Sequence, residues 1–158
     1  MPVQITIIGL GQMGASIGLA LTAHSDAVLT VGHDKDFSIE QRAKKLGAVH
    51  STNHNLHSAV EKASLVILAS PVHQIRETFG FIARDLKKDA VVVDLSPIKA
   101  EVSKWARELQ PETCHYVGLA PAIGAGYLHE TETGLDSAKA DLFSKGIFLL
   151  STFPGIPG

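Results

Sequence analysis

The chain is almost without cysteine, since Cys114 is the only one among 158 residues. A single cysteine excludes an internal disulfide framework and any metal site built from several thiolates. A surplus of one charge is also missing, because 14 Lys and Arg stand against 16 Asp and Glu, a formal net charge of -2. Such a balance creates no overall field that would attract nucleic acid or an anionic membrane. We therefore expect neither among its partners.

Long hydrophobic runs are absent as well. No stretch reaches the roughly 18 apolar residues that a membrane-spanning helix needs. The apolar N-terminal run has no basic residue before it and is broken by glycines, which argues against a secretory signal. With 45% hydrophobic and 19% charged residues, the chain can form a buried core. We predict a soluble, cytoplasmic domain.

Short apolar runs alternate with segments of helical periodicity. The runs span residues 3–8, 27–31, 64–69, 90–94, 115–119 and 146–150, with a weak strand near 48–50. Continuously apolar strands are typical of sheets that helices cover on both faces. This alternation predicts an α/β fold, a Rossmann-type doubly wound and mainly parallel sheet. We assign residues 1–151 to this domain and the turn-rich residues 152–158 to a linker or an unfinished connection.

The first apolar run ends in a glycine-rich turn, Gly9-Leu10-Gly11-Gln12-Met13-Gly14, which opens the first helix. In this strand-to-helix context a GxGxxG pattern indicates a dinucleotide site. Gly9 permits the tight turn, Gly11 lets the backbone approach a pyrophosphate, and Gly14 allows close packing of helix on strand. The N–H groups of the helix start then face the anion. The alternative is a strand-to-helix turn without a ligand.

An acidic residue, Asp34, follows the second apolar run. A carboxylate at this place can accept hydrogen bonds from the ribose hydroxyls and repels a 2′-phosphate. We therefore predict NAD as the cofactor, with NADP as the alternative because the cation Lys35 follows directly. A helix N-cap or a turn is the other interpretation of Asp34.

Two further strand ends reach the same predicted crevice, because ligands of open α/β sheets lie beyond the carboxyl ends of the strands. Ala69, Ser70 and Pro71 end the third run, and Ser96 follows the fourth. We predict that these four residues contact the cofactor. The two prolines nearby, Pro71 and Pro97, also suit the first turn of a helix.

Motifs in this order and spacing resemble the nucleotide-binding domain of prephenate and arogenate dehydrogenases. They are GLGQMGASIGLAL, VGHDKD, VILASPV, VVDLSPIKAEV, YVGLAPAIG and DLFSKGIFLLS. The resemblance extends over nearly the whole chain. It implies an NAD-dependent oxidoreductase that carries out oxidative decarboxylation of prephenate or arogenate in tyrosine biosynthesis. The substrate would then be a small molecule, and a following helical domain would complete the substrate site and form a homodimer.

The family pattern also indicates catalytic residues. At the fourth strand, Asp94 and Lys99 match the family, whereas Pro97 stands at the family's serine position with Ser96 one residue earlier. At the fifth strand the family has a histidine that acts on the substrate hydroxyl, and Ala120 stands there instead. Alanine neither donates nor accepts a hydrogen bond.

Three explanations of Ala120 remain open. His129 in the following loop could serve instead, the substrate could differ, or the protein could bind nucleotide without this catalysis. Ser96, Lys99 and His129 are accordingly the candidate catalytic residues. A nucleotide-binding or redox-sensing module is one alternative function, and an enzyme like the β-hydroxyacid dehydrogenases is another.

No metal site is predicted. His50, His54 and His57 recur at i, i+4 and i+7, but Ser51, Thr52 and Asn53 between them are typical of a loop rather than of a helix that would align the three rings.

Overall fold

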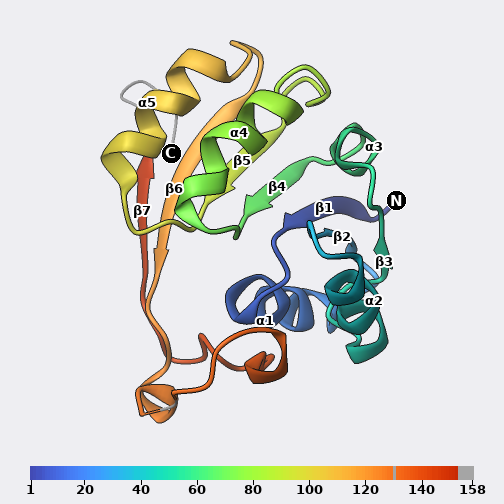
Figure 1. Cartoon of the computed structure of the whole chain (residues 1–158), viewed down its shortest axis with the longest axis vertical. Helices are drawn as coiled ribbons and strands as arrows, with labels where there is room; N and C mark the ends of the chain where they lie inside the picture. Colours follow the sequence, from blue (N-terminus) through green and yellow to red (C-terminus); the bar gives the residue numbers. More distant parts are fainter. Residues whose placement is uncertain (130, 153–158) are drawn as a thin grey trace.

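The computed structural model describes residues 1–129 and 131–152. In that part of the chain, seven strands form one sheet in the order β3-β2-β1-β4-β5-β6-β7 (Figure 1). The strands are β1 (Val3–Ile8), β2 (Val28–His33), β3 (Ser51–Thr52), β4 (Leu65–Leu68), β5 (Val91–Asp94), β6 (His115–Pro121) and β7 (Phe148–Thr152). Strands β1 to β6 pair in parallel, and β7 pairs antiparallel to β6. The predicted mainly parallel, doubly wound sheet is therefore confirmed.

Helices cover both faces of the sheet. They are α1 (Gln12–Thr22), α2 (Phe37–Leu46), α3 (Leu56–Val60), α4 (Val72–Ile82) and α5 (Lys99–Leu109), with the 3-10 turns η1 (Ala125–Tyr127) and η2 (Leu135–Ser137). Figure 1 shows α1 and α2 on one side of the sheet and α3, α4 and α5 on the other. Each side encloses its own hydrophobic cluster.

Strand β1 shows why the apolar runs are continuous. Ile7 belongs to the cluster under α1 and α2, and its neighbour Ile8 belongs to the cluster under α3, α4 and α5. Successive side chains of a strand point to opposite faces, so a strand covered on both faces is apolar at most of its buried positions; in β1 the exception is Thr6, whose hydroxyl donates to the Ala59 carbonyl oxygen. Trp105 packs against the second of these clusters and Cys114 is buried in it.

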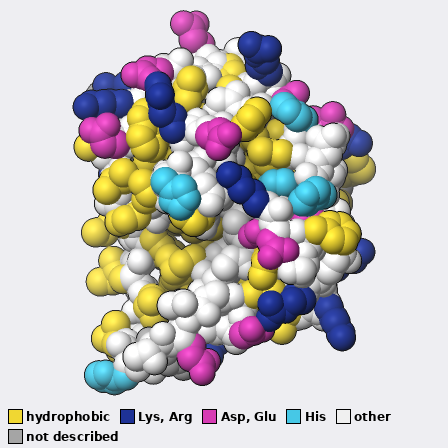
Figure 2. All heavy atoms as spheres, in the orientation of Figure 1, with side chains coloured by type: hydrophobic (Ala, Val, Ile, Leu, Met, Phe, Trp, Pro, Cys, Tyr) yellow, Lys and Arg dark blue, Asp and Glu magenta, His cyan; other side chains and the backbone are white. Residues whose placement is uncertain are grey.

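The edge strand β7 differs from the others. All five of its residues are exposed, and with Ile147 just before it they include large apolar side chains at Phe148, Leu149 and Leu150. Figure 2 shows hydrophobic side chains along this edge of the molecule. The residue that we assigned to the start of a linker, Thr152, is the last residue of β7, and residues 153–158 lie outside the described part.

Two short elements depart from the sequence-based expectation. The weak strand expected near residues 48–50 lies at Ser51–Thr52 as β3. Helix α3 was not expected, and it begins after Asn55, whose side chain accepts a hydrogen bond from the Ser58 N–H. Among the described residues, no helix combines the length and the apolar character needed to cross a bilayer.

Candidate functional site

The crevice lies at the carboxyl end of β1, where the strand order reverses between β2 and β4. Open α/β sheets bind their ligands at this switch point. A cavity of about 650 Å³ opens there, and Gly9, Gly11, Asp34, Ala69, Ser70 and Pro71 are among the residues that line it. Six of the predicted cofactor-binding residues thus come together in one cavity.

The three glycines of the turn have different surroundings. Gly9 has φ +96°, and a Cβ on it would lie 2.7 Å from the Ser70 backbone nitrogen. A Cβ on Gly14 would lie 1.9 Å from the Gly9 carbonyl oxygen, whereas one on Gly11 would meet nothing within 4 Å. Gly9 and Gly14 are therefore required by the chain itself. The space at Gly11 is open, as a ligand approaching the backbone requires.

The N-terminus of α1 adds a positive electrostatic potential to this space. Gly11 is the N-cap and offers no side-chain cap, and within α1 the first turn contains no acidic residue. The first N–H groups of a helix lack intrahelical partners and carry the positive end of the helix dipole. Since no carboxylate of the first turn neutralises this end, a phosphate group fits here.

Asp34 is held in place by the turn itself. Its Oδ2 accepts a hydrogen bond of 2.8 Å from the Leu10 N–H, and its Oδ1 accepts one of 3.0 Å from the Asp36 N–H. The N-cap of α2 is Asp36, whose pKa is lowered chiefly by hydrogen bonding to Ser38. Asp34 therefore does not cap the helix but fixes a carboxylate beside the glycine-rich turn. Lys35 lies 3.7 Å from Glu77 at the surface, a weak exposed pair.

A second hollow of about 190 Å³ continues the crevice towards β5. It shares Ala69, Ser70 and Pro71 with the larger cavity and adds Met13 and Ser96. Two other predicted cofactor-binding residues direct their side chains elsewhere: the Leu10 side chain is fully buried, and Gln12 donates to the Ser137 carbonyl oxygen.

Two of the three candidate catalytic residues meet at Asp94, which is fully buried at the end of β5. Ser96 donates to this carboxylate from its backbone N–H at 2.7 Å and from its hydroxyl at 2.9 Å. The Lys99 ammonium lies 2.7 Å from the Asp94 carbonyl oxygen and 3.1 Å from Oδ2. Asp94 thus positions both side chains.

Tyr116 is a further member of this group that sequence reasoning missed. Its hydroxyl donates to Asp94 Oδ2 at 3.2 Å. Burial, with the nearby negative charge of Asp94, raises the pKa of Tyr116 well above its ordinary value, so the hydroxyl keeps its proton at neutral pH. No local sequence pattern indicates this contact, because it depends on the register of β5 and β6, in which Tyr116 lies opposite Val92 and Gly118 opposite Asp94.

His129, the third candidate catalytic residue, lies apart from Asp94. It lines a separate hollow together with Glu132, Asp136 and Lys139. Ala120 lies near the carboxyl end of β6, where it pairs with Leu149 of β7. The structure therefore brings Ser96 and Lys99 together and places His129 in other surroundings.

This fold and crevice define a nucleotide-binding Rossmann domain. The sequence matches the family described as prephenate dehydrogenase, nucleotide-binding domain, over residues 17–153. The chain belongs to this family. The match begins inside α1, so the glycine-rich turn precedes it and is an independent indication of the same class.

Curated relatives agree with this assignment. A prephenate dehydrogenase of Bacillus subtilis (strain 168) is 27% identical over 148 residues, which are 93% of this chain and 38% of the relative. A cyclohexadienyl dehydrogenase of Zymomonas mobilis is 32% identical over 140 residues, 89% of this chain and 46% of the relative. The chain thus spans less than half the length of these two relatives.

Solved structures show the same fold. Prephenate dehydrogenase from A. aeolicus in complex with hydroxyphenyl propionate and NAD+ superposes with a TM-score of 0.83 at 20% identity, over 98% of this chain and 52% of that one. Synechocystis arogenate dehydrogenase gives a TM-score of 0.81 at 23% identity, over 96% and 51% of the two chains.

Proposed function

We propose that the chain is the NAD-binding part of a dehydrogenase of the prephenate or arogenate type. The observation that carries the proposal is the Asp34 carboxylate, which lines the cavity and accepts a hydrogen bond from the Leu10 N–H. This hydrogen bond places a carboxylate that can accept hydrogen bonds from ribose hydroxyls next to a phosphate-binding turn, which is the arrangement that dinucleotides need. The complex of the A. aeolicus prephenate dehydrogenase with NAD+ supports the same cofactor.

The residues of the crevice divide between the parts of the cofactor. The open space at Gly11 and the N-terminus of α1 would take the pyrophosphate, and Asp34 would accept hydrogen bonds from the adenosine ribose. The larger cavity has room for the adenosine half, and the smaller hollow beside Ser96 lies towards β5. Bound NAD would supply the hydride acceptor for the oxidation.

Replacing Asp34 by serine should lower the affinity for NAD by about tenfold or more, because hydrogen bonds to a charged acceptor contribute about 1.5–3 kcal/mol. The affinity for NADP should rise, because the charge that repels a 2′-phosphate is removed. Calorimetric titration with NAD, NADH and NADPH measures both changes.

Asp36→Ser is the matched control for this prediction. It removes the same charge two residues away, and serine remains a good N-cap for α2. We expect this variant to keep the preference for NAD. Equal binding of NAD and NADPH by the unsubstituted chain would contradict the role of Asp34.

The reaction proposed is the oxidative decarboxylation of prephenate or arogenate, as the curated relatives suggest. Ser96 and Lys99 are the residues of this chain best placed to contact the substrate, because Asp94 holds them at the carboxyl end of β5. They would orient a small anionic substrate against the cofactor. We expect a helical domain in the part of such enzymes that this chain does not cover, and we expect that domain to form the contacts of a homodimer. We further expect the enzyme to be cytoplasmic.

Ala120 favours a second candidate, a nucleotide-binding module without turnover. A methyl group at this position supplies no general acid or base, and a positioned histidine contributes about 10²–10⁴ in rate. His129, in its separate hollow, does not join the Ser96 and Lys99 group.

Formation of NADH from NAD with prephenate or with arogenate separates the two candidates when it is measured on the complete gene product. Turnover of either substrate supports the enzyme. Introducing the missing base as Ala120→His should then raise kcat by about 10²-fold or more. Binding of NAD without turnover of either substrate would favour the module.

A further inference from the structure

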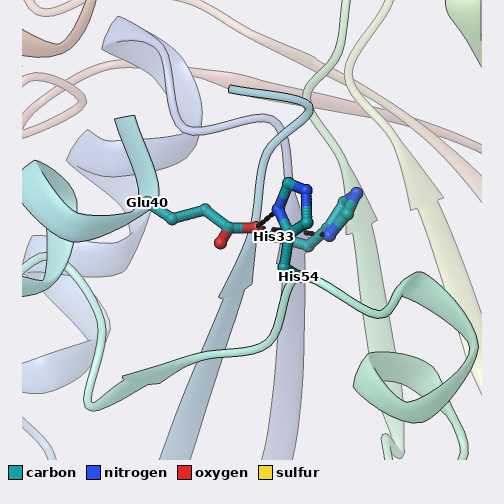
Figure 3. A group of neighbouring side chains, drawn as sticks. All are labelled: His33, Glu40 and His54. Carbon is teal, nitrogen blue, oxygen red and sulfur yellow. Dashed lines mark hydrogen bonds and ion pairs between the residues drawn. The ribbon is translucent and has the colours of Figure 1, made fainter. Parts of the chain in front are cut away.

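Two histidines and a buried glutamate gather beside the nucleotide crevice, whose cavity His33 also lines. His33 ends β2, Glu40 lies in α2, and His54 follows β3. Figure 3 shows the Glu40 carboxylate pointing towards the two neighbouring imidazole rings, with dashed lines from one of its oxygens to both rings. Its Oε1 lies 3.4 Å from His33 Nδ1 and 3.1 Å from His54 Nδ1. One ligand atom from each residue falls within 4.8 Å of the others.

Glu40 is the unusual member, because its side chain is only 1% exposed. The Asp34 N–H donates to Oε1 at 3.0 Å, but Oε2 is buried without a hydrogen-bond partner. A buried carboxylate is costly unless a cation or several donors compensate its charge. Among residues 1–129 and 131–152, Glu40 forms ion pairs with the two imidazole rings and with no lysine or arginine.

We propose that His33, Glu40 and His54 bind a divalent transition-metal ion of the zinc type. Two imidazole nitrogens and one carboxylate oxygen form a common zinc ligand set, with a fourth position left for water. Tetrahedral ligands about 2.0–2.1 Å from zinc lie roughly 3.3 Å apart. The 3.1 and 3.4 Å separations around Oε1 match this spacing.

The surroundings already orient both rings. Phe37 contacts the His54 ring edge-on with centroids 5.7 Å apart. His33 Nδ1 lies 3.1 Å from the Asn53 carbonyl oxygen, so without metal this nitrogen carries the proton and donates it. Metal binding requires the other tautomer, in which the ion takes the place of that proton.

An ion at this site would also hold the ribose-binding loop. Glu40 accepts from the Asp34 N–H, and the Asp34 carboxylate accepts from the Leu10 N–H of the glycine-rich turn. The metal would therefore connect the start of α2 to the segment after β3 and fix the backbone of Asp34. This makes it a structural ion on the wall of the crevice.

The test uses protein from which a chelator has removed bound metal. Calorimetry measures the binding of Zn²⁺ alone, and thermal unfolding with and without Zn²⁺ measures its effect on Tm. We expect one ion per chain and a rise in Tm. Mg²⁺, which prefers oxygen ligands, should produce neither. Because no nucleotide is added, the outcome does not depend on NAD binding.

His54→Ala is the decisive variant, since this half-exposed side chain can be removed without disturbing the core. Loss of a ligand should weaken Zn²⁺ binding at least as much as the roughly tenfold loss seen for outer-shell changes. Glu40→Gln keeps the shape and should weaken it as well. His24→Ala, an exposed histidine between α1 and β2, is the control. Absence of Zn²⁺ binding, or binding unchanged in His54→Ala, would overturn the proposal.

Discussion

Replacing Gly14 by alanine is expected to lower the free energy of unfolding by about 3 kcal/mol or more, at the upper end of overpacking effects. The new Cβ would lie 1.9 Å from the Gly9 carbonyl oxygen and 3.1 Å from the Ala69 Cβ. The first contact is with backbone, so no side-chain rotation relieves it. Helix α1 would have to move away from β1, which opens the cluster beneath it. Urea denaturation followed by circular dichroism measures the loss.

Gly11→Ala is the matched control three residues earlier. A Cβ there meets nothing within 4 Å, so we expect the free energy of unfolding to change by less than about 1 kcal/mol. Its effect should fall on ligand binding instead, because the methyl group occupies the space through which a pyrophosphate approaches the turn. Calorimetry should show weaker NAD binding in Gly11→Ala. An unfolding midpoint unchanged in Gly14→Ala would contradict the close packing of α1 on β1.

The parts of the fold that could be predicted are those in which local pattern and tertiary environment agree. Three of the four buried residues of β1 are isoleucines because clusters lie on both of its faces, and the fourth, Thr6, donates its hydroxyl to the Ala59 carbonyl oxygen. The GxGxxG turn is recognisable because steric contacts at Gly9 and Gly14 exclude other residues. In both cases, burial or steric contact restricts which residue type can stand at a given position, and the sequence therefore shows it.

Other features depend on contacts between distant segments. The direction of β7 is set by its pairing with β6, which no local pattern reveals. Helix α3 is too short, at five residues, to show a helical period. The spacing of the apolar runs therefore predicted neither the antiparallel direction of β7 nor the helix α3.

The histidines illustrate the same limit. His50, His54 and His57 recur at i, i+4 and i+7 in the sequence, but in the structure each of the three side chains contacts a different partner. His50 Nδ1 contacts Thr30, and His57 contacts Asp85. Only His54 reaches Glu40. The group that does form is distributed over β2, α2 and the segment after β3, and parallel pairing of β2 with β3 brings it together.

Asp94→Ala is the second substitution with a large expected effect. The Asp94 side chain is fully buried and accepts from the Ser96 N–H, the Ser96 hydroxyl, the Lys99 ammonium and the Tyr116 hydroxyl. Removing the side chain takes the carboxylate away from all of these donors in the interior, although Lys99 keeps its contact with the Asp94 backbone carbonyl oxygen. Breaking a buried charge pair from one side costs about 3–5 kcal/mol. We expect the lower end, because Lys99 is 24% exposed and can recover water.

Single changes to the donors should separate the contributions to this loss. Tyr116→Phe removes the hydrogen bond to Asp94 and should lower the free energy of unfolding by about 1 kcal/mol. Asp26→Ala, which removes an exposed carboxylate, should change it by less than about 0.5 kcal/mol. Urea midpoints of the three variants give the comparison.

A further variant, Asp94→Asn, tests whether Asp94 positions Ser96 and Lys99 for a substrate or only stabilises β5. Asp94→Asn keeps the shape of the side chain and its acceptor oxygen but removes the charge that holds the Lys99 ammonium. If the carboxylate positions Lys99, NAD affinity stays constant while kcat of the complete gene product falls. A purely structural role would lower the unfolding midpoint and leave kcat of the folded fraction unchanged. An Asp94→Ala midpoint equal to that of Asp26→Ala would show that the buried group contributes nothing to stability.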